Sequence, residues 1–349
     1  MRIFLVATLS ILPFSASAHE TIVSGALGQE LDAYLARIEA NGFSGVVLVA
    51  KGDEVILAKG YGYADREARR RCTTDTAFDI GSITKQFTGA AILKLEEMGK
   101  LNTEDKIGKH FDDVPKDKRA ITLHLLLTHS SGLRDVFGPD YVEMTRDGII
   151  QTAMEGRLKF GVGERYFYSN SGYSLLAAIV ELLTGASYES FLREQFFAPL
   201  GMTKTGYRLP SYSDEEVAVG YNKDAGRWGT PTEKLWAKDG PYWNLRGNGG
   251  ILSTVWDMYT WHKALLDDSA LTAASREKYF APYADEGGDR SHYGYGWVNL
   301  KTPRGTTVYT HNGGNGIFFA DCFRYVEERV FIMAMTNTTT GKRPHLIIS

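Results

Sequence analysis

The segment Gly81-Ser-Ile-Thr-Lys85 places a serine, Ser82, three residues before a lysine. Apolar residues follow at helical spacing as far as Gly99, which predicts a helix that opens at this serine and ends at this glycine. Residues three apart share one helix face, so Ser82 and Lys85 are expected to point the same way. A serine attacks a carbonyl only if another group takes its proton, and a buried, neutral lysine can do so. A helix cap followed by a first-turn lysine explains the same common pattern.

Two further segments carry polar side chains beside predicted elements. Tyr168-Ser-Asn170 precedes a helical pattern; a tyrosine there can relay a proton, and an asparagine amide can hold a substrate carbonyl or the lysine. His311-Asn-Gly313-Gly314 follows a strand-like run, where glycines let a substrate approach. The amides of Ser82 and Gly314 could then form an oxyanion hole. Taken singly, each segment is explained as well by a helix cap or an Asn-Gly turn.

The elements that must position these segments follow from hydrophobic spacing. A helical pattern covers residues 25–40, and two β-rich runs over 45–50 and 55–58 predict an antiparallel hairpin. Further elements are expected as helices over 123–127, 171–183 and 258–266 and as strands over 295–300, 307–310, 318–326 and 330–336. The economical fold is of the α/β (α+β) class, with one antiparallel sheet built from both chain ends, flanking helices and an inserted helical lobe.

The chain is expected to divide into a leader and one hydrolase-sized domain. Residues 1–18 combine Arg2, a short apolar run and the small-residue site Ala16-Ser-Ala18, as in a secretory signal peptide. The domain over 19–349 is expected to have a sheet lobe over 19–100 and 290–349 and a helical lobe over 101–289. Export to the periplasm or the medium follows from the leader, and no later stretch is long and apolar enough to span a membrane.

Composition argues against several other functions. The formal net charge is -3 and no basic block occurs, which argues against nucleic acid as a partner. Cys72 and Cys322 are the only cysteines; two separate thiols are favoured over a disulfide, although export permits a bridge. His124 and His129 lie five apart on different faces of a helix, so no metal site is expected. No organic cofactor is expected either.

The three segments in this order make a more specific pattern than any one of them. The sequence resembles the serine β-lactamase and penicillin-binding-protein superfamily, whose signature is Ser-x-x-Lys, then Tyr-x-Asn, then Lys/His-x-Gly on a strand. Within it, the chain looks like the class C branch of class C β-lactamases, DD-carboxypeptidases, D-aminopeptidases and family VIII carboxylesterases. Further matching stretches are Leu126-Leu-Thr-His-Ser-Ser-Gly-Leu133, Gly249-Gly-Ile-Leu-Ser-Thr254 and Met335-Thr-Asn337.

The chain departs from this family pattern in two places. Class C β-lactamases usually carry Lys-Thr-Gly as the third motif, whereas this chain has His311-Asn-Gly313. A histidine there resembles the peptidases, aminopeptidases and esterases. The family normally ends in a long helix, whereas only a short segment follows the last predicted strand, with Leu346-Ile-Ile348 as the possible start of that helix. The resemblance therefore suggests a truncated C-terminus.

The resemblance implies a β-lactamase/transpeptidase-like fold and an exported serine hydrolase that forms an acyl-enzyme on Ser82. Lys85 and Tyr168 would share the proton chemistry, with the formal base left open and Lys85 keeping the pKa of Tyr168 low. Substrate contacts would come from Asn170, His311, Gly313 and Gly314.

The substrate is a small ester, peptide or β-lactam, and three functions stay open. The first is a carboxylesterase or DD-peptidase-like hydrolase of ester or amide bonds. The second is a class C-type β-lactamase. The third, from another class, is a non-catalytic penicillin-binding sensor. Loops over 139–148 and 221–248 are expected to line the cleft, where Trp228, Trp236 and Trp243 form either an aromatic wall or core packing.

Overall fold

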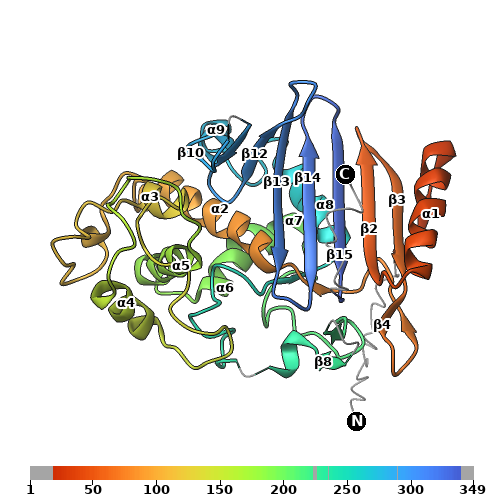
Figure 1. The fold of residues 1–349 in the computed structure, drawn as a ribbon, viewed down its shortest axis with the longest axis horizontal. Coiled ribbons are helices and arrows are strands. Elements are labelled where there is room, and N and C mark those ends of the chain that lie inside the picture. The colour runs from red at the N-terminus through yellow and green to blue at the C-terminus, as the bar shows by residue number, and fades with distance from the viewer. Residues whose placement is uncertain (1–18, 223–225, 235, 289, 339–349) are drawn as a thin grey trace, which may run out of the picture.

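The computed structural model describes residues 19–222, 226–234, 236–288 and 290–338. Its main element is a nine-stranded antiparallel sheet in the order β1-β3-β2-β15-β14-β13-β12-β11-β10. The strands are β1 (Ile22–Val23), β2 (Gly45–Lys51), β3 (Glu54–Tyr61), β10 (Ala284–Asp285), β11 (Ser291–Tyr293), β12 (Val298–Lys301), β13 (Thr307–Gly314), β14 (Phe319–Tyr325) and β15 (Val330–Thr336). Figure 1 shows the N-terminal hairpin, in red, beside the blue C-terminal strands. The two ends of the chain therefore complete one sheet, as the sequence predicts.

Helices cover the central strands on both faces. Residues 45–50 of β2 are all buried, which explains why this strand reads as a continuous apolar run. Helix α1 (Gly25–Ala40) packs on one face through a small cluster that includes Leu35, Val47 and Leu57. The other face packs against α2 (Thr84–Glu97), α8 (Val255–Ala264) and α9 (Ala273–Phe280). Strands β14 and β15 supply Cys322, Phe331 and Met333 to this larger core.

Helix α2 is the central helix of the molecule. Every residue from Thr84 to Leu93 is buried, so the helix is enclosed on all sides rather than along one apolar stripe. It follows the short 3-10 turn η1 (Gly81–Ile83). Gly99 has a φ of 68°, which stops the helix where the sequence predicts. The enclosure of α2 places Lys85, in its first turn, inside the protein.

The helical lobe lies to one side of the sheet (Figure 1). It contains η2 (Ile107–Lys109), α3 (Leu123–Leu127), α4 (Arg146–Glu155), α5 (Asn170–Thr184), α6 (Tyr188–Leu192), a π-helical turn (Arg193–Phe197) and α7 (Ala198–Leu200). The hydroxyl of Ser169 accepts the amide of Gly172 at the start of α5, and Gly185 ends that helix with a φ of 70°. Short pairs complete the fold: β4 (Tyr63–Asp65) with β5 (Arg70–Arg71), β6 (Phe78–Asp79) with β9 (Leu252–Ser253) and β7 (Gly220–Tyr221) with β8 (Arg227–Gly229), followed by η4 (Pro231–Glu233).

The predicted α/β (α+β) fold class is confirmed, with three differences of detail. The last predicted strands appear as β12 to β15, but β12 begins at Val298, because Tyr295 and Trp297 pack in the core before it. The predicted helix over 258–266 begins at Val255, because the hydroxyl of Thr254 accepts the amide of Asp257. Strand β10 belongs to the sheet, and helices α8 and α9 pack beside it. All three precede residue 290, at which the sheet lobe was predicted to resume.

Several further predictions concern single features. Cys72 and Cys322 are both buried free thiols, as favoured from the sequence. Across the described part of the chain, no three His, Cys, Asp or Glu side chains are grouped so that they could hold a metal ion. Within the described residues, no single helix is long and apolar enough to span a membrane. Helix α5 passes this test only together with residues 188–200, and the two are sharply bent relative to each other. The predicted leader and the suggested start of a C-terminal helix lie outside the described residues.

Candidate active site

Ser82 lies in the turn η1, directly before α2 and beside the end of strand β13. Gly81, which precedes it, has a φ of 51°, a conformation that side chains other than glycine rarely adopt. A Cβ atom on Gly81 would overlap the amide nitrogen of Gly314. Glycine at position 81 therefore permits both the turn and the close approach of η1 to the strand.

Lys85 is fully buried and directs its Nζ atom at Ser82. The Nζ atom lies 3.1 Å from Ser82 Oγ, 2.6 Å from Asn170 Oδ1 and 2.7 Å from the carbonyl oxygen of Asn248. Ser82 and Lys85 therefore point toward each other, as predicted from their spacing. Lys85 does lie in the first turn of α2, but Ser82 is not the helix cap of the alternative, because neither η1 nor α2 has a side-chain cap hydrogen bond.

The surroundings of Lys85 favour its neutral form. Burial lowers the pKa of Lys85 well below its usual value, and the charges of Asp135 and Asp140 only partly oppose this. A neutral amine has two hydrogens and one lone pair. Two of its three partners are carbonyl oxygens, which only accept hydrogen bonds. The lone pair is then left for the Ser82 hydroxyl, which is the arrangement that a base needs.

Tyr168 is the second candidate for proton transfer at the Ser82 hydroxyl, with which it forms a hydrogen bond. Burial raises the pKa of Tyr168, and a hydrogen bond with Ser82 opposes this only in part. Lys85 Nζ lies 4.7 Å from the centre of the Tyr168 ring. The expectation that Lys85 keeps the pKa of Tyr168 low is therefore wrong, because a buried neutral amine supplies no charge and burial dominates. At neutral pH Tyr168 is a phenol and can donate a proton.

Asn170 is held in one orientation by a carboxylate. Its Nδ2 atom donates to Asp135 Oδ1 over 2.8 Å, and its backbone amide donates to the same oxygen over 3.2 Å. The side-chain oxygen is thereby turned toward Lys85. Of the two roles that the sequence suggested for this amide, the structure has it holding the lysine; its contact with a substrate stays a prediction.

The end of strand β13 brings the backbone amide of Gly314 close to that of Ser82. A Cβ atom on Gly313 would lie 2.6 Å from the Ser82 amide nitrogen, so glycine is required where β13 meets η1. The amide of Gly314 faces the same contact. Two amides at the nucleophile fit an oxyanion hole, in which each donor typically contributes ~3 kcal/mol of transition-state stabilisation. Asn315 holds this region to Asp79 through a hydrogen bond of 3.0 Å.

His311 is bound by the protein at both ring nitrogens. Its Nδ1 atom lies 2.6 Å from the carbonyl oxygen of Asn312, and Nε2 lies 2.9 Å from the hydroxyl of Tyr293. Since the carbonyl only accepts, Nδ1 carries the hydrogen and Nε2 accepts from the tyrosine. Burial is the main cause that lowers the pKa of His311, to about 3. The predicted contact between His311 and a substrate carboxylate or carbonyl stays a prediction, and this geometry speaks against it.

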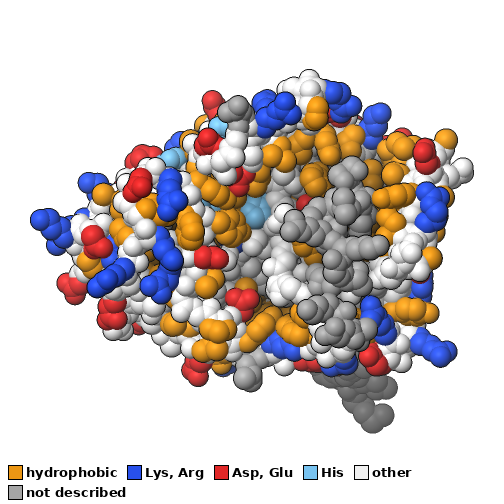
Figure 2. Space-filling view, viewed as in Figure 1, with side chains coloured by type: hydrophobic (Ala, Val, Ile, Leu, Met, Phe, Trp, Pro, Cys, Tyr) orange, Lys and Arg blue, Asp and Glu red, His pale blue; other side chains and the backbone are white. Residues whose placement is uncertain are grey.

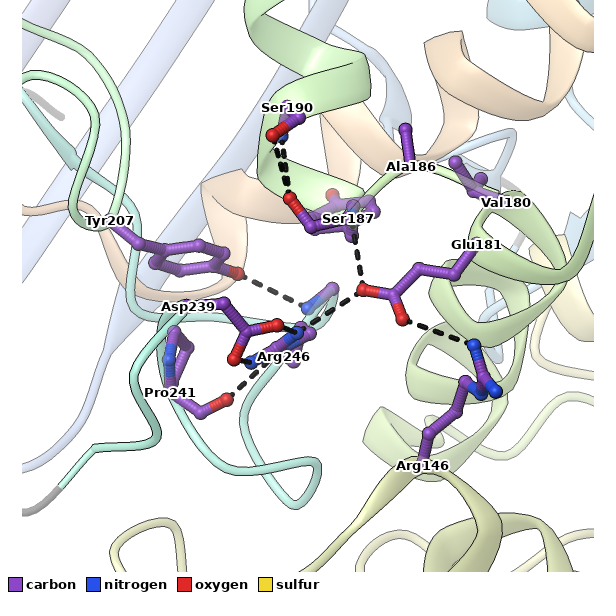
Figure 3. A network of polar contacts seen from close by, with 12 residues as sticks. Arg146, Val180, Glu181, Ala186, Ser187, Ser190, Tyr207, Asp239, Pro241 and Arg246 are labelled. Atoms are coloured by element: carbon purple, nitrogen blue, oxygen red, sulfur yellow. Dashed lines mark hydrogen bonds and ion pairs between the residues drawn. The ribbon is translucent and has the colours of Figure 1, made fainter. Parts of the chain in front are cut away.

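The loop that presents Asn248 to Lys85 is fixed by the buried Arg246 (Figure 3). Its guanidinium donates to both oxygens of Asp239, over 2.8 and 2.9 Å, and to Glu181 Oε1 over 3.2 Å. Its Nε atom donates to the carbonyl of Pro241. Glu181 belongs to α5, the helix that starts at Asn170. The same helix therefore positions Asn170 and, through Arg246, the Asn248 carbonyl.

This chain is similar in sequence and in fold to known proteins. The family described as Beta-lactamase matches residues 31–347. The chain belongs to the beta-lactamase family. The Bacillus subtilis protein "Penicillin-binding protein 4*" is 30% identical over 313 residues, which cover 86% of this chain and 69% of that protein. Membership of this superfamily makes the chain a serine hydrolase.

Solved structures agree with the family assignment. The octameric penicillin-binding protein homologue from Pyrococcus abyssi superposes with a TM-score of 0.80 and 29% identity, over 93% of this chain and 76% of that chain. A D-amino acid amidase from Ochrobactrum anthropi SV3, in complex with L-phenylalanine, has a TM-score of 0.76 and 26% identity, over 90% and 92% of the two chains. Both the predicted superfamily and the predicted fold are thus confirmed.

The cavities of this beta-lactamase family member beside Ser82 are acidic. A cavity of about 60 Å³ is lined by Ser82, Asn170, Asp79, Asp140 and other residues, and one of about 440 Å³ is lined by Tyr168, His311, Glu286 and Asp321 among others. Neither lining contains a lysine or an arginine. Figure 2 shows acidic side chains, in red, beside the hollow near the middle of this face. A negatively charged substrate would therefore meet like charge.

Sequence reasoning missed the residues that support the motifs. Asp135, Asp140 and Asn248 all act near Lys85, and each lies in a loop without an element pattern of its own. The predicted cleft loops did include Asp140 and Asn248, without a role for either. In the second loop, Trp236 and Trp243 pack in the core instead of forming an aromatic wall. The Gly-Asn-Gly-Gly run that ends at Gly250 was the one available signal for the Asn248 turn.

The role of Arg246 gives a testable expectation. Arg246→Lys keeps the charge but loses the two-pronged contact with Asp239, so the free energy of unfolding should fall by roughly 2–3 kcal/mol. Ester hydrolysis should also slow about tenfold, because the Asn248 carbonyl loses its support. Arg227→Lys is the matched control: Arg227 makes the same two-pronged contact with Glu233 but is 45% exposed. It should cost no more than about 1 kcal/mol. Equal effects of the two variants in urea unfolding would contradict the assignment.

Proposed function

We propose that this protein hydrolyses small ester or amide substrates through an acyl-enzyme on Ser82. The observation that carries the proposal is the contact of 3.1 Å between Ser82 Oγ and a buried lysine whose two other partners are carbonyl oxygens. Such a lysine can take the proton of the attacking hydroxyl at neutral pH. The intact set of catalytic side chains speaks against the non-catalytic sensor.

The reaction would proceed in two stages. Ser82 Oγ attacks the substrate carbonyl while Lys85 accepts the hydroxyl proton, and the amides of Ser82 and Gly314 bind the oxygen that becomes negative. Tyr168, protonated because burial raises its pKa, donates to the leaving group and is reprotonated from Lys85. Water then attacks the ester on Ser82 with the same groups in reverse, which releases the acid and restores the serine.

The charges around the cleft favour substrates without a carboxylate. Burial raises the pKa of Asp79 to about 7 and also raises the pKa of Asp140, so Asp79 carries most of its negative charge only above pH 7; no lysine or arginine in either lining offsets this charge. His311 is neutral across the physiological range, since its pKa is about 3. An uncharged ester, the carboxylesterase alternative, fits this cleft better than a β-lactam, whose carboxylate needs a cation.

The substrate preference can be measured directly. At pH 7.5 the kcat/KM for p-nitrophenyl butyrate should exceed that for nitrocefin by about tenfold or more, because only the cephalosporin brings a carboxylate into an acidic cleft. The ratio should rise between pH 6 and 8, because Asp79, whose pKa burial raises to about 7, gains its negative charge over this range while His311 does not titrate. A preference for nitrocefin would instead support the class C-type β-lactamase.

A second candidate function is hydrolysis of amides or esters that carry a free amino group. Asp140 favours it, because its carboxylate lines the small cavity that also holds Ser82. A substrate ammonium placed there would pair with it. The D-amino acid amidase similarity is in keeping with such a substrate.

Asp140 provides the test of this candidate. Asp140→Asn should lower kcat/KM for alanine p-nitroanilide, in the D or L form, about tenfold, and should affect p-nitrophenyl butyrate much less, because that ester has no ammonium and the Asp140 charge is only a minor influence on Lys85. Asp147→Asn serves as the control, because Asp147 is 86% exposed and forms only a loose pair with Arg146. Equal loss on both substrates would mean that Asp140 acts on the catalytic groups rather than on a substrate amine.

Export is also a proposal, and it rests on the sequence of residues 1–18. In the structure, His19 is held by Asp75, which accepts from the His19 amide nitrogen over 2.8 Å and contacts Nδ1 over 2.6 Å. Cleavage after Ala18 would turn this amide nitrogen into an ammonium, which would pair with Asp75. N-terminal sequencing of periplasmic and medium fractions should read His-Glu-Thr, whereas an unprocessed cytoplasmic chain would refute export.

A further inference from the structure

A cavity of about 230 Å³ lies far from the catalytic side chains, between the sheet and helices α8 and α9. It shares no lining residue with the two cavities beside Ser82. Its lining comprises Gly52, His262, Leu265, Leu266, Arg276, Phe280, Tyr309, Arg324, Tyr325, Val326 and Arg329. The set contains three arginines and no aspartate or glutamate. Neither the family assignment nor the proposed hydrolysis gives this cavity a role.

Arg324 is the buried cation in this lining. It is 6% exposed, and its guanidinium lies 4.9 Å from the centre of the Phe280 ring and 5.7 Å from that of Trp297. Its Nε atom donates to His262 Nδ1 over 2.9 Å, while Nη1 is buried without a hydrogen-bond partner. Within the described ranges of the chain, no carboxylate oxygen lies within 4.0 Å of this guanidinium.

The groups around Arg324 do not neutralise it. Burial lowers the pKa of Arg324 only to about 10, so the side chain is charged at neutral pH. Burial also lowers the pKa of His262 to about 3, so that ring is neutral. The other two arginines have acids of their own: Arg276 pairs with Asp268, and Arg329 with Asp53 at the rim. Arg324 alone has no counter-charge.

A buried charge without a partner is costly, and arginine cannot escape the cost by losing its proton. An anion in the cavity would supply the missing charge and satisfy Nη1. Part of the remaining wall is apolar, since Leu265, Leu266, Phe280 and Val326 line the same cavity. A bound molecule must therefore combine one anionic group with an apolar body.

We propose that this cavity binds an organic carboxylate with a compact apolar body, such as a medium-chain fatty acid. The carboxylate would accept hydrogen bonds from Arg324, whose planar guanidinium matches two carboxylate oxygens. The chain of the ligand would lie along Leu265, Leu266 and Phe280 and leave past Leu266, which is 59% exposed. The site is separate from Ser82, so its occupancy does not depend on the proposed hydrolysis.

Thermal unfolding and calorimetry of the full chain with octanoate test this site. Octanoate should raise the melting temperature of the wild type, whereas octanamide, which lacks the charge, and inorganic phosphate, which lacks the apolar body, should not. Arg324→Gln should weaken octanoate binding about tenfold or more, because it removes the charged donor. Arg304→Gln should leave binding unchanged, because Arg304 is 72% exposed and pairs with Glu328 outside the cavity.

A second variant keeps the test decisive if Arg324→Gln fails to fold. Leu266→Trp places a larger side chain at the exposed rim and should also weaken octanoate binding about tenfold, without touching the guanidinium. Ester hydrolysis, followed in parallel, should be unchanged in this variant. Absence of octanoate binding to the wild type, equal binding of phosphate, or undiminished binding to both variants would each overturn the proposal.

Discussion

Ser82→Ala should abolish hydrolysis of p-nitrophenyl butyrate, with a loss of about 10⁴-fold or more in kcat. The variant removes the only nucleophile in the proposed reaction. In the wild type this atom, Ser82 Oγ, lies 3.1 Å from the Nζ atom of Lys85. The fold should survive, because the side chain that is lost is a single hydroxyl in a turn that Gly81 and Gly313 shape. Steady-state kinetics and the melting temperature of the purified variant measure both parts of this expectation.

The matched control for this variant is Ser211→Ala, at an exposed serine outside the cleft linings. It should hydrolyse the ester at the wild-type rate. If Ser82→Ala retained more than a few per cent of the wild-type rate at an unchanged melting temperature, a nucleophile other than Ser82 would have to be sought. The acyl-enzyme assignment would then be wrong.

Lys85→Met and Tyr168→Phe should each slow acylation by about 10²–10⁴-fold, and the double variant should be little slower than the worse single variant. Lys85 and Tyr168 both contact the Ser82 hydroxyl and move the same proton, so removing either breaks the relay. Methionine fills the volume of the buried lysine without its charge, which separates loss of the base from loss of packing. Pre-steady-state bursts of p-nitrophenol measure the acylation rate.

The pH profile gives the sign of the Lys85 contribution. Because burial lowers the pKa of Lys85, the amine stays neutral well below the pH at which an exposed lysine would take a proton. Activity should therefore be maintained through neutral pH and fall only on the acidic side, as Lys85 becomes protonated. Tyr168→Phe should keep this acidic limb and Lys85→Met should lose it.

If the two single losses multiplied in the double variant, the residues would act independently and the relay would be wrong.

Much of the fold is readable from the sequence because its elements are locally determined. The hairpin of β2 and β3 and the four long C-terminal strands follow from β-rich runs and turns, and both ends had to meet in one sheet to be buried. Ser82 and Lys85 could be placed together because helical spacing alone puts them on one face. Domain boundaries were less readable, since α8 and α9 return to the sheet without any change in composition.

The protonation states could not be read in the same way, because they depend on burial by distant segments. Burial by distant segments lowers the pKa of Lys85, and its carbonyl partners come from positions 170 and 248, which no local pattern connects. His311 looked like a free histidine in a strand, but Tyr293 and its own neighbour occupy both ring nitrogens. The same limit explains why the expected low pKa of Tyr168 is wrong. The sequence suggests a nearby cation, but it does not reveal the burial that raises this pKa.

The most direct test of the acyl-enzyme assignment is intact-protein mass spectrometry after exposure to a fluorophosphonate, followed by peptide mapping. The wild type should gain one phosphonyl group, and the modified peptide should carry it on Ser82, because this hydroxyl is the one placed against a neutral amine. Ser82→Ala should gain nothing under the same conditions. A wild-type protein that stays unmodified, or one that is labelled at another residue, would contradict the central claim that Ser82 is the activated nucleophile.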